Sequence, residues 1–167
     1  MRKEGCQLAR WRFFVFICIG LLVVLCDQLT KAWVRANLEF GEVFFKAGFF
    51  RIIRVQNTGA VFGMFKEHTQ TIIILAFVGI AVIIFLLFYL RRRWPFLDDM
   101  LVLTGIGLLL GGTIGNQIDR IWLGYVTDFL DLSFWPTFNI ADSSSTVGTI
   151  ILLYCIVFRS GLLKSGK

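Results

Sequence analysis

Four long apolar stretches alternate with shorter polar segments along the chain, at residues 13–34, 71–90, 100–118 and 143–158. The second stretch runs for 20 residues without a charged side chain, about the length that crosses the hydrocarbon of a bilayer as a helix. The third contains Gly111, Gly112 and Gly115, and small residues of this kind let neighbouring membrane helices approach closely. The pattern predicts four transmembrane helices.

The segment between the first two stretches, residues 35–69, is too long to be a simple connection. Within it, residues 49–55 combine aromatic and β-branched side chains, which is typical of a β-strand. Asn57-Thr58-Gly59, which follows, is typical of a turn. The predicted fold is an all-α membrane protein forming one domain over residues 1–167, with four transmembrane helices. A small β-rich extracytoplasmic subdomain is expected in this first outer loop, with its aromatic side chains in the membrane interface.

The composition agrees with a membrane protein and excludes most other classes. Apolar residues make up 57% of the chain and charged residues 17%, and 18 of the 167 residues are Phe. A soluble domain of this size could not bury so much apolar surface. The net charge of +6 comes from Lys and Arg clusters beside the apolar stretches. That placement is typical of membrane-flanking cations, so no nucleic-acid partner is expected.

The distribution of basic residues predicts the orientation in the membrane. With four spans, both termini and the short loop at residues 91–99 lie on one side of the bilayer. This side carries ten Lys or Arg residues, against seven on or beside the other side. Because short loops rich in Lys and Arg face the cytoplasm, we expect both termini there and residues 35–69 outside.

The alternating direction of the spans brings scattered polar residues to one depth. The outer ends of the spans and both outer loops would meet at the outer membrane–water interface. Ionisable groups at such a depth are costly and usually functional. The residues that converge there are Asp27, Lys31, Asn57, Asn116, Asp119, Arg120, Asp128, Asn139 and Asp142.

Most of these charges have a structural explanation beside a functional one. Asp27 and Lys31 are four residues apart on a helix and would form an ion pair. Asp119 would be neutralised by the adjacent Arg120, although Arg120 is equally placed to reach a substrate carbonyl. Asp142 precedes three serines and suits a helix N-cap, a position that also favours an anion.

Asp128 lies in an extended apolar segment without such an explanation, so a functional role is expected for it. Two carboxylates in a poorly hydrated site do not both ionise readily. A shared proton would let one activate water while the other protonates a leaving amide. His68 is the only histidine and lacks companions for zinc, although carboxylates alone would suit Mg²⁺. The residues by themselves leave Asp119 open as a member of the pair.

Five motifs occur in order along nearly the whole chain: Asp27-Gln28-Leu29-Thr30-Lys31; Asn57-Thr58-Gly59-Ala60 with Phe62-Gly63; Gly111-Gly112 with Gly115-Asn116 and Asp119-Arg120; Val126-Thr127-Asp128-Phe129; and Phe138-Asn139-Ile140-Ala141-Asp142-Ser143. Each motif alone is a weak signal, but five in order on four spans are specific. By these motifs the chain resembles the bacterial lipoprotein signal peptidases (signal peptidase II).

The resemblance implies an aspartic endopeptidase of the bacterial cytoplasmic membrane that needs no metal or other cofactor. Its substrates would be prolipoproteins, cut just before the cysteine that carries the diacylglyceryl group. Membrane lipids and the inhibitory cyclic peptide globomycin would be its other partners. The resemblance assigns catalysis to Asp128 and Asp142. It further implies substrate-binding roles for Asn57, Gly59, Asn116, Arg120 and Asn139, and structural support from Asp27, Lys31, Asp119 and Ala141.

Two functions from other classes compete with this one. A small proton- or cation-coupled transporter would use Asp128 and Asp142 as ion ligands. It predicts charges near the bilayer midplane or along a continuous path, whereas the predicted cluster lies at one end of the spans. A non-catalytic scaffold predicts that Asp→Asn changes at these two positions have no effect.

Overall fold

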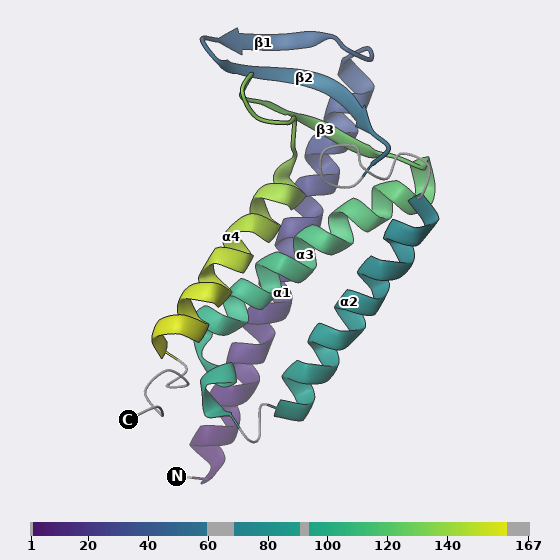
Figure 1. Ribbon diagram of the computed structural model, residues 1–167. Helices are drawn as coiled ribbons and strands as arrows, with labels where there is room; N and C mark the ends of the chain where they lie inside the picture. Colours follow the sequence, from purple (N-terminus) through teal and green to yellow (C-terminus); the bar gives the residue numbers. More distant parts are fainter. Residues whose placement is uncertain (1, 60–68, 91–93, 160–167) are drawn as a thin grey trace.

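The structure is a computed structural model that describes residues 2–59, 69–90 and 94–159 (Figure 1). Its helices are α1 (Arg2–Asn37), α2 (Thr69–Leu90), α3 (Met100–Leu123) and α4 (Ile140–Tyr154). A short 3-10 helix, Pro95–Asp98, precedes α3, and a π-helical turn, Cys155–Arg159, continues α4. Within the described residues, four helical segments are long and apolar enough to cross a membrane. The predicted helical membrane fold is confirmed.

Of the four helical segments that can span the membrane, three are longer than the sequence pattern predicted, and the second has the predicted length of 20 residues. They cover Trp11–Asn37, Gln70–Tyr89, Met100–Leu123 and Ile140–Arg159. The largest difference is at the end of the third, where Asp119 and Arg120 continue the helix instead of ending it. Gly124 ends α3 in the left-handed conformation, with φ of 78°, which glycine adopts without steric cost.

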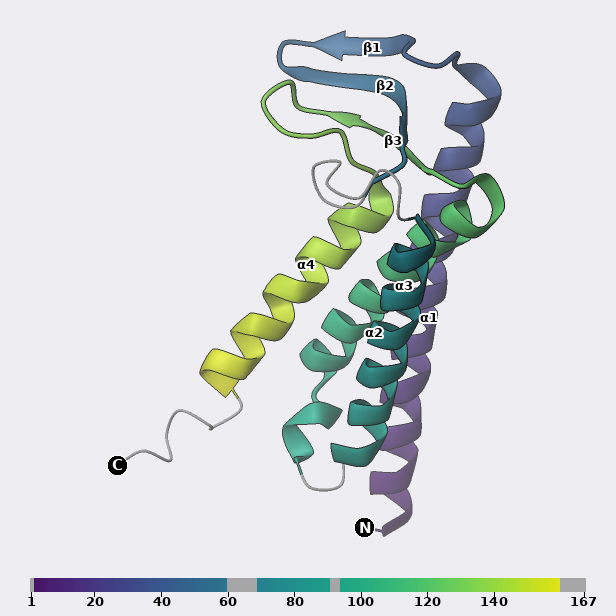
Figure 2. The same cartoon turned by 45° about the vertical axis from the view of Figure 1, so that its right-hand side comes forward.

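Helix α3 is the central element of the bundle. In its most apolar stretch of 18 residues 61% of the residues are buried, against 6–17% in the corresponding stretches of the other helices. It packs against α1, α2 and α4, and both views show α2 and α4 on different sides of it (Figures 1 and 2). The outward surfaces of α1, α2 and α4 are apolar and exposed, as helices in contact with lipid require.

Glycines allow the close approach of α1 and α4 to α3. A Cβ at Gly111 would lie 2.8 Å from the backbone oxygen of Gly20 on α1. A Cβ at Gly148 would lie 2.6 Å from the oxygen of Gly105 on α3. Both distances are too short for a side chain, so these helices meet backbone to backbone, as small residues allow in membranes.

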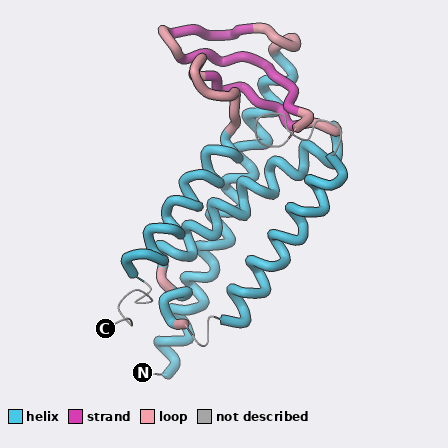
Figure 3. Tube along the Cα trace, viewed as in Figure 1, coloured by secondary structure: helices cyan, strands magenta, loops and turns pink. Residues whose placement is uncertain are grey.

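A three-stranded antiparallel sheet covers one end of the bundle (Figure 3). Its order is β1 (Val43–Ala47), β2 (Phe50–Asn57) and β3 (Val126–Asp131). The start of α1 and the end of α4 lie at the opposite end (Figure 1). The prediction confined the β structure to the first outer loop, but its third strand comes from the segment after α3. This strand brings Asp128 beside Val55.

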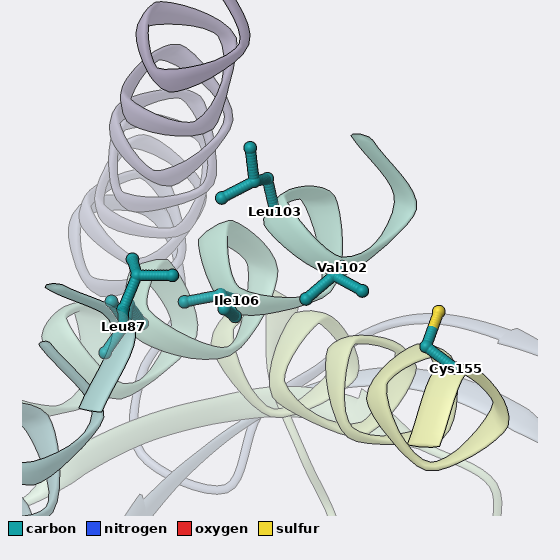
Figure 4. Close-up of a cluster of buried hydrophobic side chains, with 6 residues drawn as sticks. Leu87, Val102, Leu103, Ile106 and Cys155 are labelled. Atoms are coloured by element: carbon teal, nitrogen blue, oxygen red, sulfur yellow. The ribbon is translucent and has the colours of Figure 1, made fainter. Parts of the chain in front are cut away.

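Two groups of buried apolar residues hold the elements together. At the end away from the sheet, Leu87, Val102, Leu103, Ile106 and Cys155 join α2, α3 and α4 (Figure 4). Under the sheet, a smaller cluster of Val34, Leu38 and Phe129 joins the end of α1 to β3. The second cluster fixes β3 over the helix ends.

Candidate active site

Asp128 occupies the middle of β3 and is 1% exposed. Its Oδ2 accepts a hydrogen bond of 2.9 Å from Nδ2 of Asn57, the last residue of β2. Its Oδ1 accepts a hydrogen bond of 2.7 Å from Nδ2 of Asn139, which precedes α4. Two amide donors from different elements therefore fix both oxygens of the carboxyl group.

Asp142 lies in the first turn of α4, and its role there differs from the predicted one. The N-cap is Asn139, whose Oδ1 accepts from the backbone N–H of Asp142 at 2.9 Å. Oδ2 of Asp142 accepts in return from the backbone N–H of Asn139 at 3.2 Å. This is a capping box, so Asp142 is its third helical residue and not the N-cap. Oδ1 of Asp142 accepts from Nδ2 of Asn116 on α3 at 2.7 Å.

Asn139 connects the two aspartates. It is completely buried, and its Nδ2 lies within hydrogen-bond distance of Asp128 while its backbone and Oδ1 bind Asp142. Its Nδ2 also lies 3.1 Å from Oδ1 of Asn116. Asn116 and Asn139 therefore hold both carboxyl groups in one polar network.

The surroundings favour the protonated form of Asp128. Burial, together with the negative charge of Asp142, raises the pKa of Asp128 from its ordinary value of 3.8 to about 7. The hydrogen bonds from Asn57 and Asn139 act in the opposite direction because they stabilise the ionised form. A carboxylic acid that holds its proton near neutral pH is suited to general acid catalysis.

A buried charge network lies beneath this site. Lys31 on α1 is completely buried, with its Nζ 2.8 Å from Oδ2 of Asp27 and 2.8 Å from Oδ1 of Asn116. The predicted ion pair of Asp27 and Lys31 is confirmed. Oδ1 of Asp27 also accepts from the backbone N–H of Ala141 at 2.9 Å. The pair therefore connects α1 to the start of α4 and to Asn116, which contacts Asp142.

Asp119 belongs to this network and not to the carboxyl pair. Its Oδ2 accepts from the backbone N–H of Thr127 at 2.9 Å, which positions β3 next to Asp128. The predicted neutralisation of Asp119 is confirmed, but the cations lie on α1 and not at the adjacent position. They are Lys31 at 3.6 Å and Arg35 at 3.4 Å.

The remaining predicted residues lie around the aspartates. Arg120 donates from Nη1 to Oε1 of Gln117 at 3.1 Å, and Nε2 of Gln117 donates to the backbone oxygen of Ile73 on α2 at 3.1 Å. The backbone N–H of Gly59 donates to Oδ1 of Asn57 at 3.0 Å, which gives the expected turn and orients the Asn57 amide. The rest of that motif, at residues 60–63, and His68 lie outside the described residues.

Sequence reasoning did not single out Arg35 or Gln117. Arg35 follows Asp27 and Lys31 at four-residue spacing, so a check along that helix face would have found it. Gln117 is a buried amide on a membrane helix, a class of residue that usually makes a specific hydrogen bond.

Solved structures with the same fold indicate the class of protein to which this chain belongs. The chain superimposes on a bacterial membrane enzyme solved by the in meso method with a TM-score of 0.78 and 29% identity, covering 92% of this chain and 93% of that one. A second bacterial membrane enzyme solved in the same way matches with a TM-score of 0.73 and 28% identity, covering 87% and 94%. The architecture is that of a bacterial membrane enzyme.

Sequence comparison identifies the family within this class. A lipoprotein signal peptidase of Dehalococcoides mccartyi is 45% identical over 151 residues, covering 89% of this chain and 92% of its own. The corresponding enzyme of Moorella thermoacetica is 39% identical over 147 residues, covering 87% and 95%. The family model of signal peptidase (SPase) II matches residues 19–158. The chain belongs to the signal peptidase II family, as its motifs predicted, and is a membrane peptidase.

Proposed function

We propose that this chain is an aspartic endopeptidase that removes the signal peptide from diacylglyceryl-modified prolipoproteins. The cut would fall on the N-terminal side of the lipid-bearing cysteine. The observation that carries the proposal is the pairing of Asp128 and Asp142 through Asn139. Membership of the signal peptidase II family supports the substrate class.

The two aspartates would hydrolyse the peptide bond with one shared proton. The ionised carboxylate takes a proton from water while the water oxygen bonds to the scissile carbonyl carbon. The protonated carboxyl group then gives its proton to the amide nitrogen, and the carbon–nitrogen bond breaks to give an acid and an amine. The raised pKa of Asp128, about 7, favours it as the group that donates the proton to the amide nitrogen. The two groups titrate as a pair.

The neighbouring polar residues would position the substrate. Asn57, Asn116 and Asn139 already donate to the aspartates, so their amides fix which oxygens face the bond. Arg120 lies four residues after Asn116 on α3, which places both on one helix face. Its guanidinium would bind a substrate carbonyl oxygen, and the turn at Gly59 would contact the substrate backbone.

The network under the site would support catalysis indirectly. Asp27, Lys31 and Asp119 would hold the start of α4, Asn116 and β3 in fixed positions through the contacts with Ala141, Asn116 and Thr127. They would act as positioning residues and would not touch the substrate.

The enzyme would lie in the bacterial cytoplasmic membrane, with both termini in the cytoplasm. The pair of Asp128 and Asp142, called the dyad below, would lie at the outer face. The sheet lies at the same end of the bundle as the aspartates, and the start of α1 and the end of α4 lie at the other (Figure 1). A substrate whose acyl chains stay in the bilayer presents its scissile bond near the outer membrane–water interface. Membrane lipids and globomycin-type inhibitors would bind at the same end.

The test is a gel-shift assay of a diacylglyceryl-modified prolipoprotein, in detergent or lipid, with and without a chelator. Wild type is expected to cleave in both conditions. Asp128→Asn and Asp142→Asn should each lower the rate by at least about 10³-fold, because neither amide can exchange the required proton.

Asp99→Asn is the matched control. Asp99 caps α3 at the far end of the bundle by accepting from Leu101 at 2.8 Å, and asparagine caps a helix equally well. This variant should cleave like wild type. A folded wild type that leaves the lipid-modified substrate intact would contradict the proposal. Ion-flux assays would then test the transporter alternative. Loss of cleavage with the chelator alone would contradict the metal-free mechanism.

A further inference from the structure

An apolar cavity of about 360 Å³ lies at the end of the bundle away from the aspartates. Figure 4 shows part of its wall, where α2, α3 and α4 meet. Its lining is apolar and includes Ile83 and Leu86 on α2, Val102 and Ile106 on α3, Leu152 on α4, and Ile156 in the π-helical turn that continues α4. The dyad and the network beneath it do not account for this cavity.

The cavity opens to the lipid between α2 and α4. Leu86 and Ile156 both line it, yet they remain 43% and 47% exposed. Helix α3 lies between the other two helices and packs against both, so it forms the floor of the opening. An apolar chain in the bilayer could therefore enter from the side.

The cavity and Asp142 lie on the same face of α4. Starting at Asp142, the spacing of three and four residues passes through Ser145, Thr149, Leu152 and Ile156. Residues with this spacing share one face of a helix. A substrate segment that runs along this face from Asp142 reaches the cavity.

The other two walls show the same continuity. On α3, Gln117 lies on one face with Leu110 and Ile106, at intervals of seven and four residues. On α2, Ile73 and Ile80 are seven residues apart, and Ile80 packs against the buried cluster beside the cavity. The hydrogen bond from Gln117 to the Ile73 oxygen joins these faces near the dyad. We call the opening between α2 and α4, whose floor is formed by α3, the α2/α4 seam.

We propose that the α2/α4 seam binds the apolar segment of the substrate's signal peptide, with the cavity receiving its N-terminal end. This inference rests on the proposed function. Ile156 lies 14 residues after Asp142, which corresponds to about 21 Å of helix. The apolar segment of a signal peptide has about 7–15 residues, or about 10–22 Å as a helix. It precedes the scissile bond and continues toward the cytoplasmic side, where the cavity lies in the proposed orientation.

The seam would make the enzyme selective for the length of the apolar segment. A long segment reaches the cavity and gains apolar contacts there, whereas a segment about two turns shorter ends before it. Filling the cavity should therefore impair cleavage of the long substrate alone.

The test compares Ile156→Trp with Val157→Trp. Val157 is adjacent, 44% exposed, and is not part of the cavity wall. For Ile156→Trp we expect a fall of roughly tenfold in kcat/KM with a 15-residue apolar segment, because the larger side chain would occupy space that the end of this segment needs. With an 8-residue segment no change is expected, and Val157→Trp should leave both rates as in wild type. Equal rates, or equal losses, with the two substrates in Ile156→Trp would overturn the inference.

Photocross-linking measures binding without requiring cleavage. A benzophenone amino acid at Leu86 should cross-link to the long signal peptide. The same group at Phe85, which is 62% exposed and stacks on Tyr89 with ring centroids 5.5 Å apart, should not. Absence of the Leu86 cross-link would overturn the docking site. Failure of wild type to cleave either substrate would instead refute the proposed function, and the cross-link would still report on docking.

Discussion

Asn139 gives the site its geometry, because one side chain and its own backbone contact both aspartates. An asparagine is well suited to this position, since its amide offers an acceptor to the helix N-terminus and donors to Asp128. The same residue therefore begins α4 and orients the carboxyl pair. Helix formation and assembly of the site depend on one another at this position.

The pKa of Asp128 predicts a pH-dependent stability. Between its ordinary value of 3.8 and its folded value of about 7, the folded protein holds a proton at Asp128 that the unfolded chain has released. Stability from this group is therefore present at low pH and is lost as the pH rises through about 7. Wild type should unfold at a lower temperature at pH 8 than at pH 5.5.

For Asp128→Asn the free energy of unfolding should fall less than in wild type between pH 5.5 and pH 8, by about 1–3 kcal/mol, because asparagine does not ionise. Thermal unfolding of both proteins in the same detergent measures the difference. Asp99→Asn, at the far end of the bundle, should keep the wild-type dependence. Parallel curves for wild type and Asp128→Asn would contradict the shifted pKa.

The polar residues of the site could largely be chosen from the sequence, but their partners could not. The four-residue spacing predicted the ion pair of Asp27 and Lys31. The partner of Asp119 depends on how α1 packs against α3, so adjacency to Arg120 was misleading. Likewise, Asp142 looked like a cap because the sequence does not show that the helix begins earlier, at Ile140.

At the level of elements, the contact between α3 and α4 depends on a position without a side chain. Gly148→Ala should destabilise the protein by about 1–3 kcal/mol, because the added methyl group would lie 2.6 Å from the oxygen of Gly105. Since α4 carries Asp142, activity should fall with stability. Gly79→Ala on α2 is the control, because a Cβ there meets nothing within 4 Å.

Thermal unfolding and cleavage rate, measured on both variants, check this prediction. Gly79→Ala should be as stable as wild type or slightly more stable, since alanine favours helix. If Gly148→Ala retained wild-type stability and activity, the tight α3–α4 contact would be contradicted.

The elements differ in how well the sequence predicts them. Membrane helices are predictable because an apolar stretch of about 20 residues has few other stable conformations. The third strand was not predicted as part of the sheet, because β3 joins β2 from a segment distant in sequence, through the pairing of Val55 with Asp128. Hydrophobic pattern does not encode such long-range pairing.

At the level of the whole molecule, the arrangement of the bundle predicts the orientation in the membrane. The sheet and the dyad lie at one end (Figure 2), and Arg12 and Arg159, which bind Asp98 and Asp99 just before α3, lie at the other. Positive residues remain on the cytoplasmic side, so the sheet should face outward. In this orientation the dyad would lie on the side of the membrane where, under the proposed function, lipid-modified precursors present their scissile bond.

Labelling of introduced cysteines in intact cells tests the orientation. Lys46→Cys in the exposed strand β1 should react with a membrane-impermeant maleimide, because in the proposed orientation this strand would face the outer compartment. Arg159→Cys, which is exposed at the end of α4, should react only after the cells are opened. Both variants belong in a background without the native cysteines, two of which, Cys18 and Cys26, are exposed on α1. The reverse labelling pattern would place the dyad in the cytoplasm, and a peptidase facing that way could not cut precursors at the outer surface.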